Sequence, residues 1–99
     1  MFVVTNRIPV KPEYREQFEE SFRRRAGLVD RMPGFIRNEV WRAIGTNDYL
    51  VTTYWANEES FNAWTQSEAF HRAHGGGGSR EMYAGAPTLE KYEVIQSTE

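Results

Sequence analysis

The stretch FIRNEVWRAIGTNDYLVTTYWA, residues 35–56, carries the pattern that decides the fold of this 99-residue chain. Two segments rich in β-branched and aromatic residues, 35–43 and 49–56, flank the turn-like sequence IGTND. This arrangement predicts a β-hairpin. Both segments carry apolar residues on both faces, which suggests that the second face of the resulting sheet is covered as well.

Residues 2–10, FVVTNRIPV, precede the hairpin and alternate in the manner of a half-buried strand. The even-numbered face is predicted to point inward, and it holds Phe2, Val4, Asn6, Ile8 and Val10. Asn6 is the exception on this face, because it is a polar amide among four apolar neighbours.

Residues 11–31, KPEYREQFEESFRRRAGLVDR, predict the first helix. An apolar stripe recurs every four residues at Tyr14, Phe18 and Phe22. At about 100° per residue, Arg25 falls within the same arc, whereas Arg23 and Arg24 are expected to point elsewhere. Arg25 is therefore the odd residue on its helix face, as Asn6 is on its strand.

A second helix is predicted from Asn57, its expected N-cap, through residue 66, with Phe61 and Trp64 on one side. The sequence SEAFHRAH, residues 67–74, starts another helical turn.

In that turn Phe70 and His74 share a face, while His71 projects about 100° away. Gly75 is the expected stop, and it opens the glycine run 75–78.

Residues 88–95, TLEKYEVI, predict a last strand, and the complete order is then β-α-β-β-α-β. This order is typical of an α+β, ferredoxin-like sheet with its helices on one face. We expect residues 1–99 to form one domain. The other face of the sheet would need a partner, most simply a second copy of the chain, so a homodimer is predicted.

Composition excludes several classes of function. The net charge is −2, so no bulk electrostatic attraction to nucleic acid is expected. The absence of cysteine excludes disulfides, thiolate metal sites and cysteine nucleophiles, and it fits a reducing compartment. We read no signal peptide in the N-terminal residues and no apolar run long enough for a bilayer, so the expectation is a cytoplasmic protein without a membrane partner.

Familiar catalytic motifs are also missing from the sequence. His71 and His74 lack a third ligand, so structural zinc is not expected. No nucleophile elbow marks a serine, and the GGGGS run lacks the Lys-Ser/Thr of a phosphate loop.

Four residues have an ordinary structural explanation when each is taken alone. Trp64 suits a core, His74 a helix C-terminus, Asn6 a bond to nearby backbone, and the Arg25 stem can lie along apolar surface. Taken together, they fit a pocket with apolar walls, a few convergent polar groups and a cation for an anionic tail.

These residues carry a resemblance to a known family. With Asn6 on the first strand, the segments FRRRA, MPGF, YLVTTYWANEESFNAW and SEAFHRAH resemble the antibiotic-biosynthesis-monooxygenase superfamily over nearly the whole chain. The combination of Asn6, Trp64 and His74 resembles the catalytic set of its IsdG-type haem-degrading monooxygenases, most closely the MhuD-like branch. Phe22 and Arg25 match pocket positions of that branch, whereas the all-glycine loop after His74 departs from it.

The resemblance implies a dimeric α+β barrel with haem as both cofactor and substrate. His74 would be the axial ligand of the haem iron, and Phe70 would lie beside the haem. Asn6 would donate a hydrogen bond on the opposite, oxygen-binding side. Trp64 would press on the porphyrin, and Arg25 would neutralise a propionate. Electrons would come from an external donor such as an NADPH-dependent reductase.

Two other functions remain compatible with the same residues. One is a cofactor-independent oxygenase of the superfamily, acting on a quinol or an aromatic polyketide. The other is a non-catalytic haem-binding protein. An iron ligand at His74 and an amide on an apolar face favour haem over the first, and turnover with an electron donor would separate the enzyme from the second.

Overall fold

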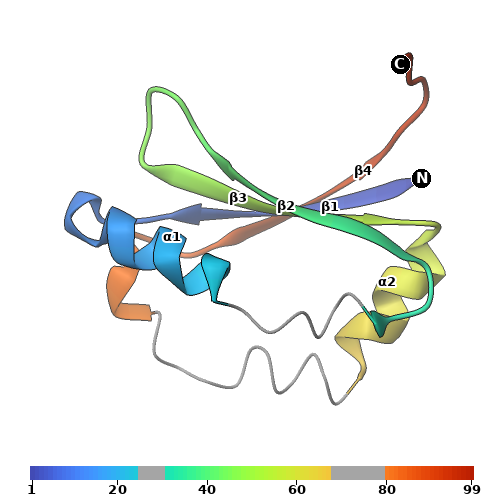
Figure 1. The fold of residues 1–99 in the computed structure, drawn as a ribbon, viewed down its shortest axis with the longest axis horizontal. Coiled ribbons are helices and arrows are strands. Elements are labelled where there is room, and N and C mark those ends of the chain that lie inside the picture. Colours follow the sequence, from blue (N-terminus) through green and yellow to red (C-terminus); the bar gives the residue numbers. More distant parts are fainter. Residues whose placement is uncertain (25–30, 68–79) are drawn as a thin grey trace.

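A four-stranded antiparallel sheet forms the centre of the protein in a computed structural model, which describes residues 1–24, 31–67 and 80–99 (Figure 1). The strands lie in the order β2-β3-β1-β4, and both helices cover the same face of the sheet. In chain order the elements are β1 (Phe2–Pro9), the 3₁₀ turn η1 (Pro12–Tyr14), α1 (Arg15–Arg23), β2 (Phe35–Arg42), β3 (Asp48–Trp55), α2 (Glu58–Thr65), the 3₁₀ turn η3 (Arg80–Met82) and β4 (Thr88–Glu93).

The predicted ferredoxin-like plan is confirmed, including the hairpin of β2 and β3, whose register pairs Val40 with Val51. Asn57 caps α2 as expected, because its side chain accepts a hydrogen bond from the Ser60 backbone N–H at 2.9 Å. The last strand is shorter than predicted and ends at Glu93.

The first helix begins differently from the prediction. Pro12 opens the 3₁₀ turn η1, and the α-helix proper starts only at Arg15. Proline lacks a backbone N–H, so it suits this first turn. Residues 25–30 of the predicted helix lie outside the described residues.

Two separate clusters of buried residues lie between the sheet and the helices. The α2 core consists of Val4, Trp55, Phe61 and Trp64. The α1 core consists of Ile8, Val10, Phe18 and Tyr49, with Tyr14 and Phe22 packed against it. The predicted inward face of β1 and the predicted stripe of α1 are both confirmed, and β1 contributes side chains to both cores.

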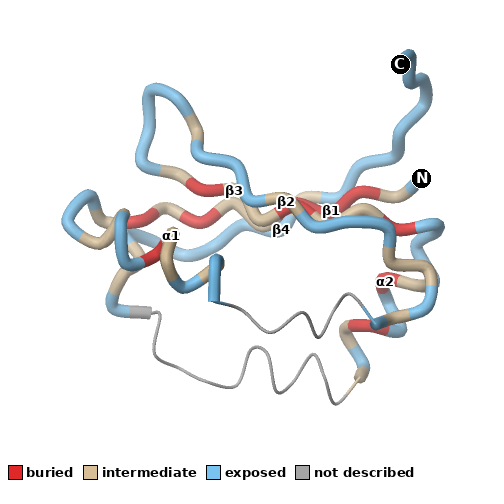
Figure 2. The backbone as a smooth tube through the Cα atoms, viewed as in Figure 1, coloured by how far each residue is buried: buried red, intermediate tan, exposed pale blue. Residues whose placement is uncertain are grey.

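The opposite face of the sheet, called here the open face, is covered by neither helix but contains buried side chains (Figure 2). Val3, Thr5 and Thr52 are each less than 10 % exposed. The sequence predicted that β1 would be buried on one face only. Burial of its other face depends on which strands flank β1, and the strand order is not apparent from the local pattern. Both β1 neighbours place a tyrosine opposite Val3, namely Tyr54 of β3 and Tyr92 of β4.

No helix in the described residues is long and apolar enough to cross a membrane.

Candidate active site

Asn6 lies at the boundary between the two cores, on the face of the sheet that carries the helices. It alternates with Val4 of the α2 core and Ile8 of the α1 core, so the three share this face. The strand register places it in a row across the sheet, in the order Leu89, Asn6, Val51 and Val40. We call this row the floor, and Asn6 is its single polar member.

The Asn6 amide makes no side-chain hydrogen bond to any residue in the described ranges. Its side chain is half-buried, so water still reaches it. An amide with two donors and an acceptor is costly to cover with apolar groups unless a partner is supplied. Asn6 is therefore available to a ligand that lies on the floor.

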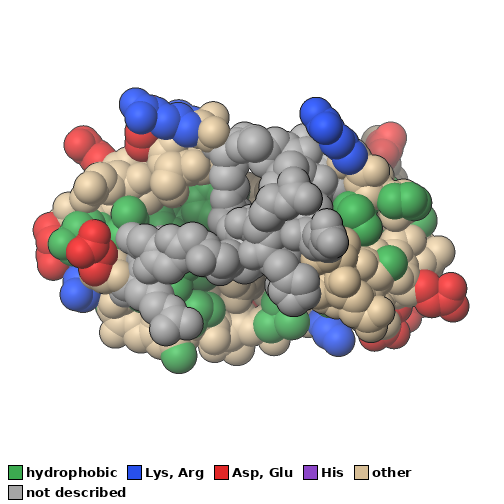
Figure 3. All heavy atoms as spheres, turned by 90° about the horizontal axis from the view of Figure 1, so that it is seen from below, with side chains coloured by type: hydrophobic (Ala, Val, Ile, Leu, Met, Phe, Trp, Pro, Cys, Tyr) green, Lys and Arg blue, Asp and Glu red, His purple; other side chains and the backbone are tan. Residues whose placement is uncertain are grey.

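Aromatic side chains from the two helices belong to the cores on either side of the floor. Phe22 comes from α1, is half-buried, and its ring lies 4.9 Å from that of Phe18. Trp64 comes from α2 and is 7 % exposed in the α2 core. Seen from the helix side, described hydrophobic side chains are visible at both the α1 and the α2 ends of the molecule (Figure 3). The predicted Asn6, Phe22 and Trp64 thus belong to three elements that border one strip of sheet.

The remaining predicted site residues cannot be placed in this geometry. Arg25, Phe70 and His74 lie outside the described residues, as does His71, to which no role is assigned. Their roles stay predictions. Within the described ranges, no group of three or more His, Asp or Glu side chains could hold a metal ion.

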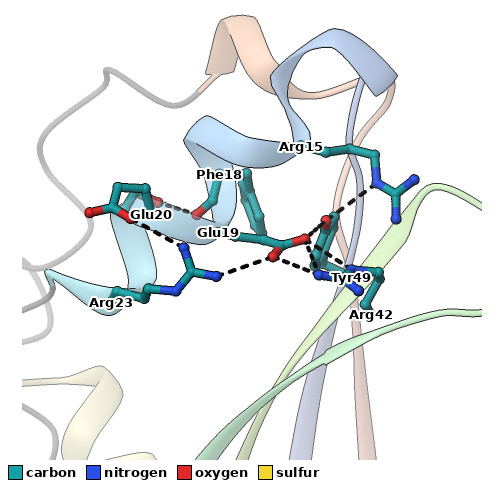
Figure 4. A network of polar contacts seen from close by, with 8 residues as sticks. Arg15, Phe18, Glu19, Glu20, Arg23, Arg42 and Tyr49 are labelled. Atoms are coloured by element: carbon teal, nitrogen blue, oxygen red, sulfur yellow. Dashed lines mark hydrogen bonds and ion pairs between the residues drawn. The ribbon is translucent and has the colours of Figure 1, made fainter.

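A charged network ties α1 to the hairpin on the α1 side of the floor (Figure 4). The Arg42 guanidinium donates to both carboxylate oxygens of Glu19, with Nη2–Oε1 at 2.7 Å and Nε–Oε2 at 2.9 Å. The Tyr49 hydroxyl donates a further, short hydrogen bond to the same carboxylate. The bonds from Arg42 and then Tyr49 lower the pKa of the Glu19 carboxyl to about 2. Glu19 is therefore an anion throughout the physiological range.

A pocket of about 290 Å³ opens beside this network, and it adds a residue that the sequence did not predict for the site. Its lining consists of Glu19, Phe22, Arg23, Val40, Arg42 and Tyr49. The helical stripe suggested that Arg23 points away from the apolar side. The spacing could have predicted this position, because Arg23 follows Glu19 by four residues and residues four apart share a helix face.

The sheet and its two helices define a small α+β fold with a strip of largely apolar sheet surface between two cores. Residues 1–76 match the antibiotic biosynthesis monooxygenase family, and the chain belongs to that family.

Curated relatives of the chain are named heme oxygenases. It is 38 % identical over 101 residues to a heme oxygenase (staphylobilin-producing) of Staphylococcus epidermidis, covering 98 % of this chain and 91 % of the relative. It is 34 % identical over 94 residues to a heme oxygenase (mycobilin-producing) of Mycobacterium tuberculosis, covering 94 % and 88 %.

A solved structure extends this similarity to three dimensions. The heme-degrader MhuD of Mycobacterium tuberculosis, with two hemes bound in its active site, superposes with a TM-score of 0.84 at 30 % identity. The superposition covers 100 % of both chains. The predicted resemblance to the MhuD-like branch is thereby confirmed.

Proposed function

We propose that this chain is a haem-degrading monooxygenase, which opens the porphyrin ring of bound haem with O₂ and external electrons and releases the iron. The observation that carries the proposal is the Asn6 amide, which lies in an otherwise apolar floor and has no side-chain hydrogen bond within the described residues. The names of the relatives supply the class of substrate.

The described residues fit the shape and chemistry of haem. The porphyrin is flat and largely apolar, and the floor offers it Val40, Val51 and Leu89. Aromatic groups on both sides of the floor, Phe22 and Trp64, suit the faces and edges of such a ring. A ligand pocket of this kind needs few polar groups, and their placement fixes the orientation of the ligand.

Each residue has a distinct part in the proposed reaction. The Asn6 N–H₂ donates a hydrogen bond on the side of the haem where oxygen is activated. Trp64, fixed by its packing in the α2 core, presses on the ring from the α2 end. His74 ligates the iron, and Phe70 and Arg25 hold the ring and a propionate. The haem supplies the oxygen chemistry when electrons reach it.

The proposal includes two protein partners. A second copy of the chain covers the open face and completes a dimeric barrel. Support comes from apolar groups that this face leaves exposed, including Trp41 at 42 % and Tyr92 at 51 %. A reductase supplies the electrons, in the cytoplasm, which the absence of cysteine suits.

Haem binding and turnover test this function against its alternatives. Purified protein is titrated with haemin, and its absorption spectrum is followed in air after addition of ascorbate or a reductase, with catalase present to remove free peroxide. The enzyme should bind haemin and then replace the haem band by bile-pigment-like absorption. A persistent haem band would indicate a haem-binding protein without catalysis, and failure to bind would favour the cofactor-independent oxygenase.

A further inference from the structure

The pocket beside Glu19 adjoins the floor of the candidate active site. It shares Val40 with the floor and Phe22 with the α1 end of the site, and it extends outward to Arg23 and Arg42. Its volume of about 290 Å³ is too small for a porphyrin but ample for a short side arm. The pocket therefore offers apolar walls toward the floor and cations toward solvent.

The cations of this pocket are not equally free to meet a ligand. Arg42 is held by Glu19 through charge-assisted hydrogen bonds of 2.7–2.9 Å, and Tyr49 donates to the same carboxylate. Arg23 meets Glu19 only at 3.5 Å and Glu20 at 3.1 Å, and its side chain is 65 % exposed. Exposed ion pairs of this kind contribute little to stability. Arg23 can exchange them for a ligand at low cost.

The charge of the pocket favours an anion. Two arginines and one carboxylate line it, and the carboxylate is already engaged by Arg42 and Tyr49. Glu20, the other partner of Arg23, also binds Arg24 at 2.9 Å. Glu20 thus keeps a cationic partner if Arg23 turns toward the pocket.

Arg24 provides a natural comparison within the same run of arginines. It carries the same charge one residue away, its side chain is 79 % exposed, and it does not line the pocket. Any effect of net charge on an anionic ligand would be the same for both residues. An effect of position would belong to Arg23 alone.

We propose that Arg23 is a positioning residue that binds a carboxylate side arm of the tetrapyrrole in the pocket between α1 and β2, while Arg42 and Tyr49 keep Glu19 from competing for it. This rests on the proposed function. Arg23 would then be a second arginine that binds a propionate, in addition to the predicted Arg25. The arginine fork suits this task, because it matches the geometry of a carboxylate. Arg23 would thereby help to set which edge of the ring faces Asn6.

The test removes each partner of the proposed contact in turn. Esterification removes the carboxylate from the porphyrin, and substitution removes the arginine from the protein. Fluorescence titrations measure the Kd of metal-free protoporphyrin IX and of its dimethyl ester for the parent, Arg23→Gln and Arg24→Gln. We expect Arg23→Gln to bind the free acid about five- to tenfold more weakly than the parent, and the ester equally well. Arg24→Gln should behave as the parent does with both ligands.

Two results would overturn the assignment of Arg23. One is an unchanged preference of Arg23→Gln for the free acid, and the other is an equal loss in Arg24→Gln, which would make the effect one of general charge. A haemin titration of the parent keeps this outcome distinct from failure of the proposed function. If the parent binds neither haemin nor porphyrin, both proposals fall; if it binds them and Arg23→Gln binds as well, only the role of Arg23 falls.

Discussion

Asn6 is a polar residue at odds with the apolar residues beside it in the sheet. A structural asparagine on an apolar strand face satisfies its amide within the protein, whereas Asn6 makes no side-chain hydrogen bond to the described residues. Its neighbours in the row, Leu89 and Val51, are apolar and cannot supply one. Within the described residues, the Asn6 amide thus stays open to water and to any ligand that reaches the floor.

Replacing Asn6 by alanine should separate catalysis from binding. The variant loses no hydrogen bond within the described protein, so it should fold and bind haemin much as the parent does. Turnover should fall on the order of a hundredfold, which is typical of removing one donor that stabilises developing charge. Loss of the haem band in air with a reductase measures the rate, and circular dichroism checks the fold.

Asn62→Ala is the matched control for that experiment. Asn62 is an exposed amide on α2, so its loss should leave both binding and turnover intact. An unfolded Asn6→Ala would mean that the amide is structural. Full turnover in Asn6→Ala would place the oxygen-side donor elsewhere.

At the scale of elements, the turn before β2 is held against the start of α2. The Ala56 backbone N–H donates to the Gly34 carbonyl at 2.8 Å. Gly34 has a φ of +83°, and a Cβ at this position would lie 2.5 Å from the Ser60 Cβ. The sequence Pro33-Gly34 predicted a turn, but it could not show that the turn packs on a helix that begins more than twenty residues later.

Gly34→Ala should therefore destabilise the protein by about 2–4 kcal/mol, because backbone strain and a clash with α2 add together. Gly45 provides the control, since it also has a positive φ, +96°, but nothing lies within 4 Å of its added Cβ. Gly45→Ala should cost about 1–2 kcal/mol from strain alone. Urea unfolding monitored by tryptophan fluorescence gives both values, and equal losses would contradict the packing of this turn on α2.

The Glu19 network predicts a pH-dependent contribution to stability. The pKa of Glu19 is lowered to about 2 in the folded protein, so the stabilisation is complete above the ordinary value of 4.5 and is lost as the pH falls toward 2. Arg42 is half-exposed, and solvent screening reduces the effect to on the order of 1–2 kcal/mol.

Glu19→Gln should therefore be less stable than the parent by that amount at pH 7. The difference in free energy of unfolding should narrow between pH 4.5 and pH 3. Urea titrations of both proteins at pH 7, 4.5 and 3 provide the measurement. A difference that does not change with pH would show that packing of the side chain, rather than its charge, stabilises the joint between α1 and the hairpin.

At the scale of the whole molecule, the open face carries both buried polar groups and exposed aromatic groups, which a single copy of the chain does not account for. The hydroxyls of Thr5 and Thr52 are buried there without a hydrogen-bond partner in the described structure. Trp41 and Tyr92 remain exposed on the same face. A second copy packed on this face would bury the aromatic groups and complete the barrel.

Sedimentation velocity at micromolar concentration should accordingly give about twice the chain mass of 11.5 kDa. Trp41→Glu should shift this equilibrium toward the monomer by at least tenfold, because it buries an unpaired charge in the interface. Gln17→Glu adds the same charge on the exposed side of α1 and should leave the dimer intact. A monomeric parent, or equal effects of the two changes, would contradict dimerisation through the open face.

Much of this architecture could be predicted from local patterns. The hairpin, the cap at Asn57 and the inward face of β1 depend on neighbours in sequence, and all three were predicted correctly. Burial of Thr5 on the open face depends on β3 and β4, which flank β1 only after folding. The pocket at Arg23 depends on the pairing of Glu19 with Arg42, which lie 23 residues apart in the chain. Such long-range pairings leave no periodic signal in the sequence.

The most direct test of the central claim is the amount of iron released for each haem consumed. The protein with one bound haem is supplied with electrons and air in the presence of catalase, and a ferrous chelator reports the iron while the haem band is followed. We expect close to one chelatable iron for each haem lost, and almost none from Asn6→Ala over the same time. A haem band that persists in the parent, or one that fades without release of iron, would contradict the assignment of this chain as a haem-degrading monooxygenase.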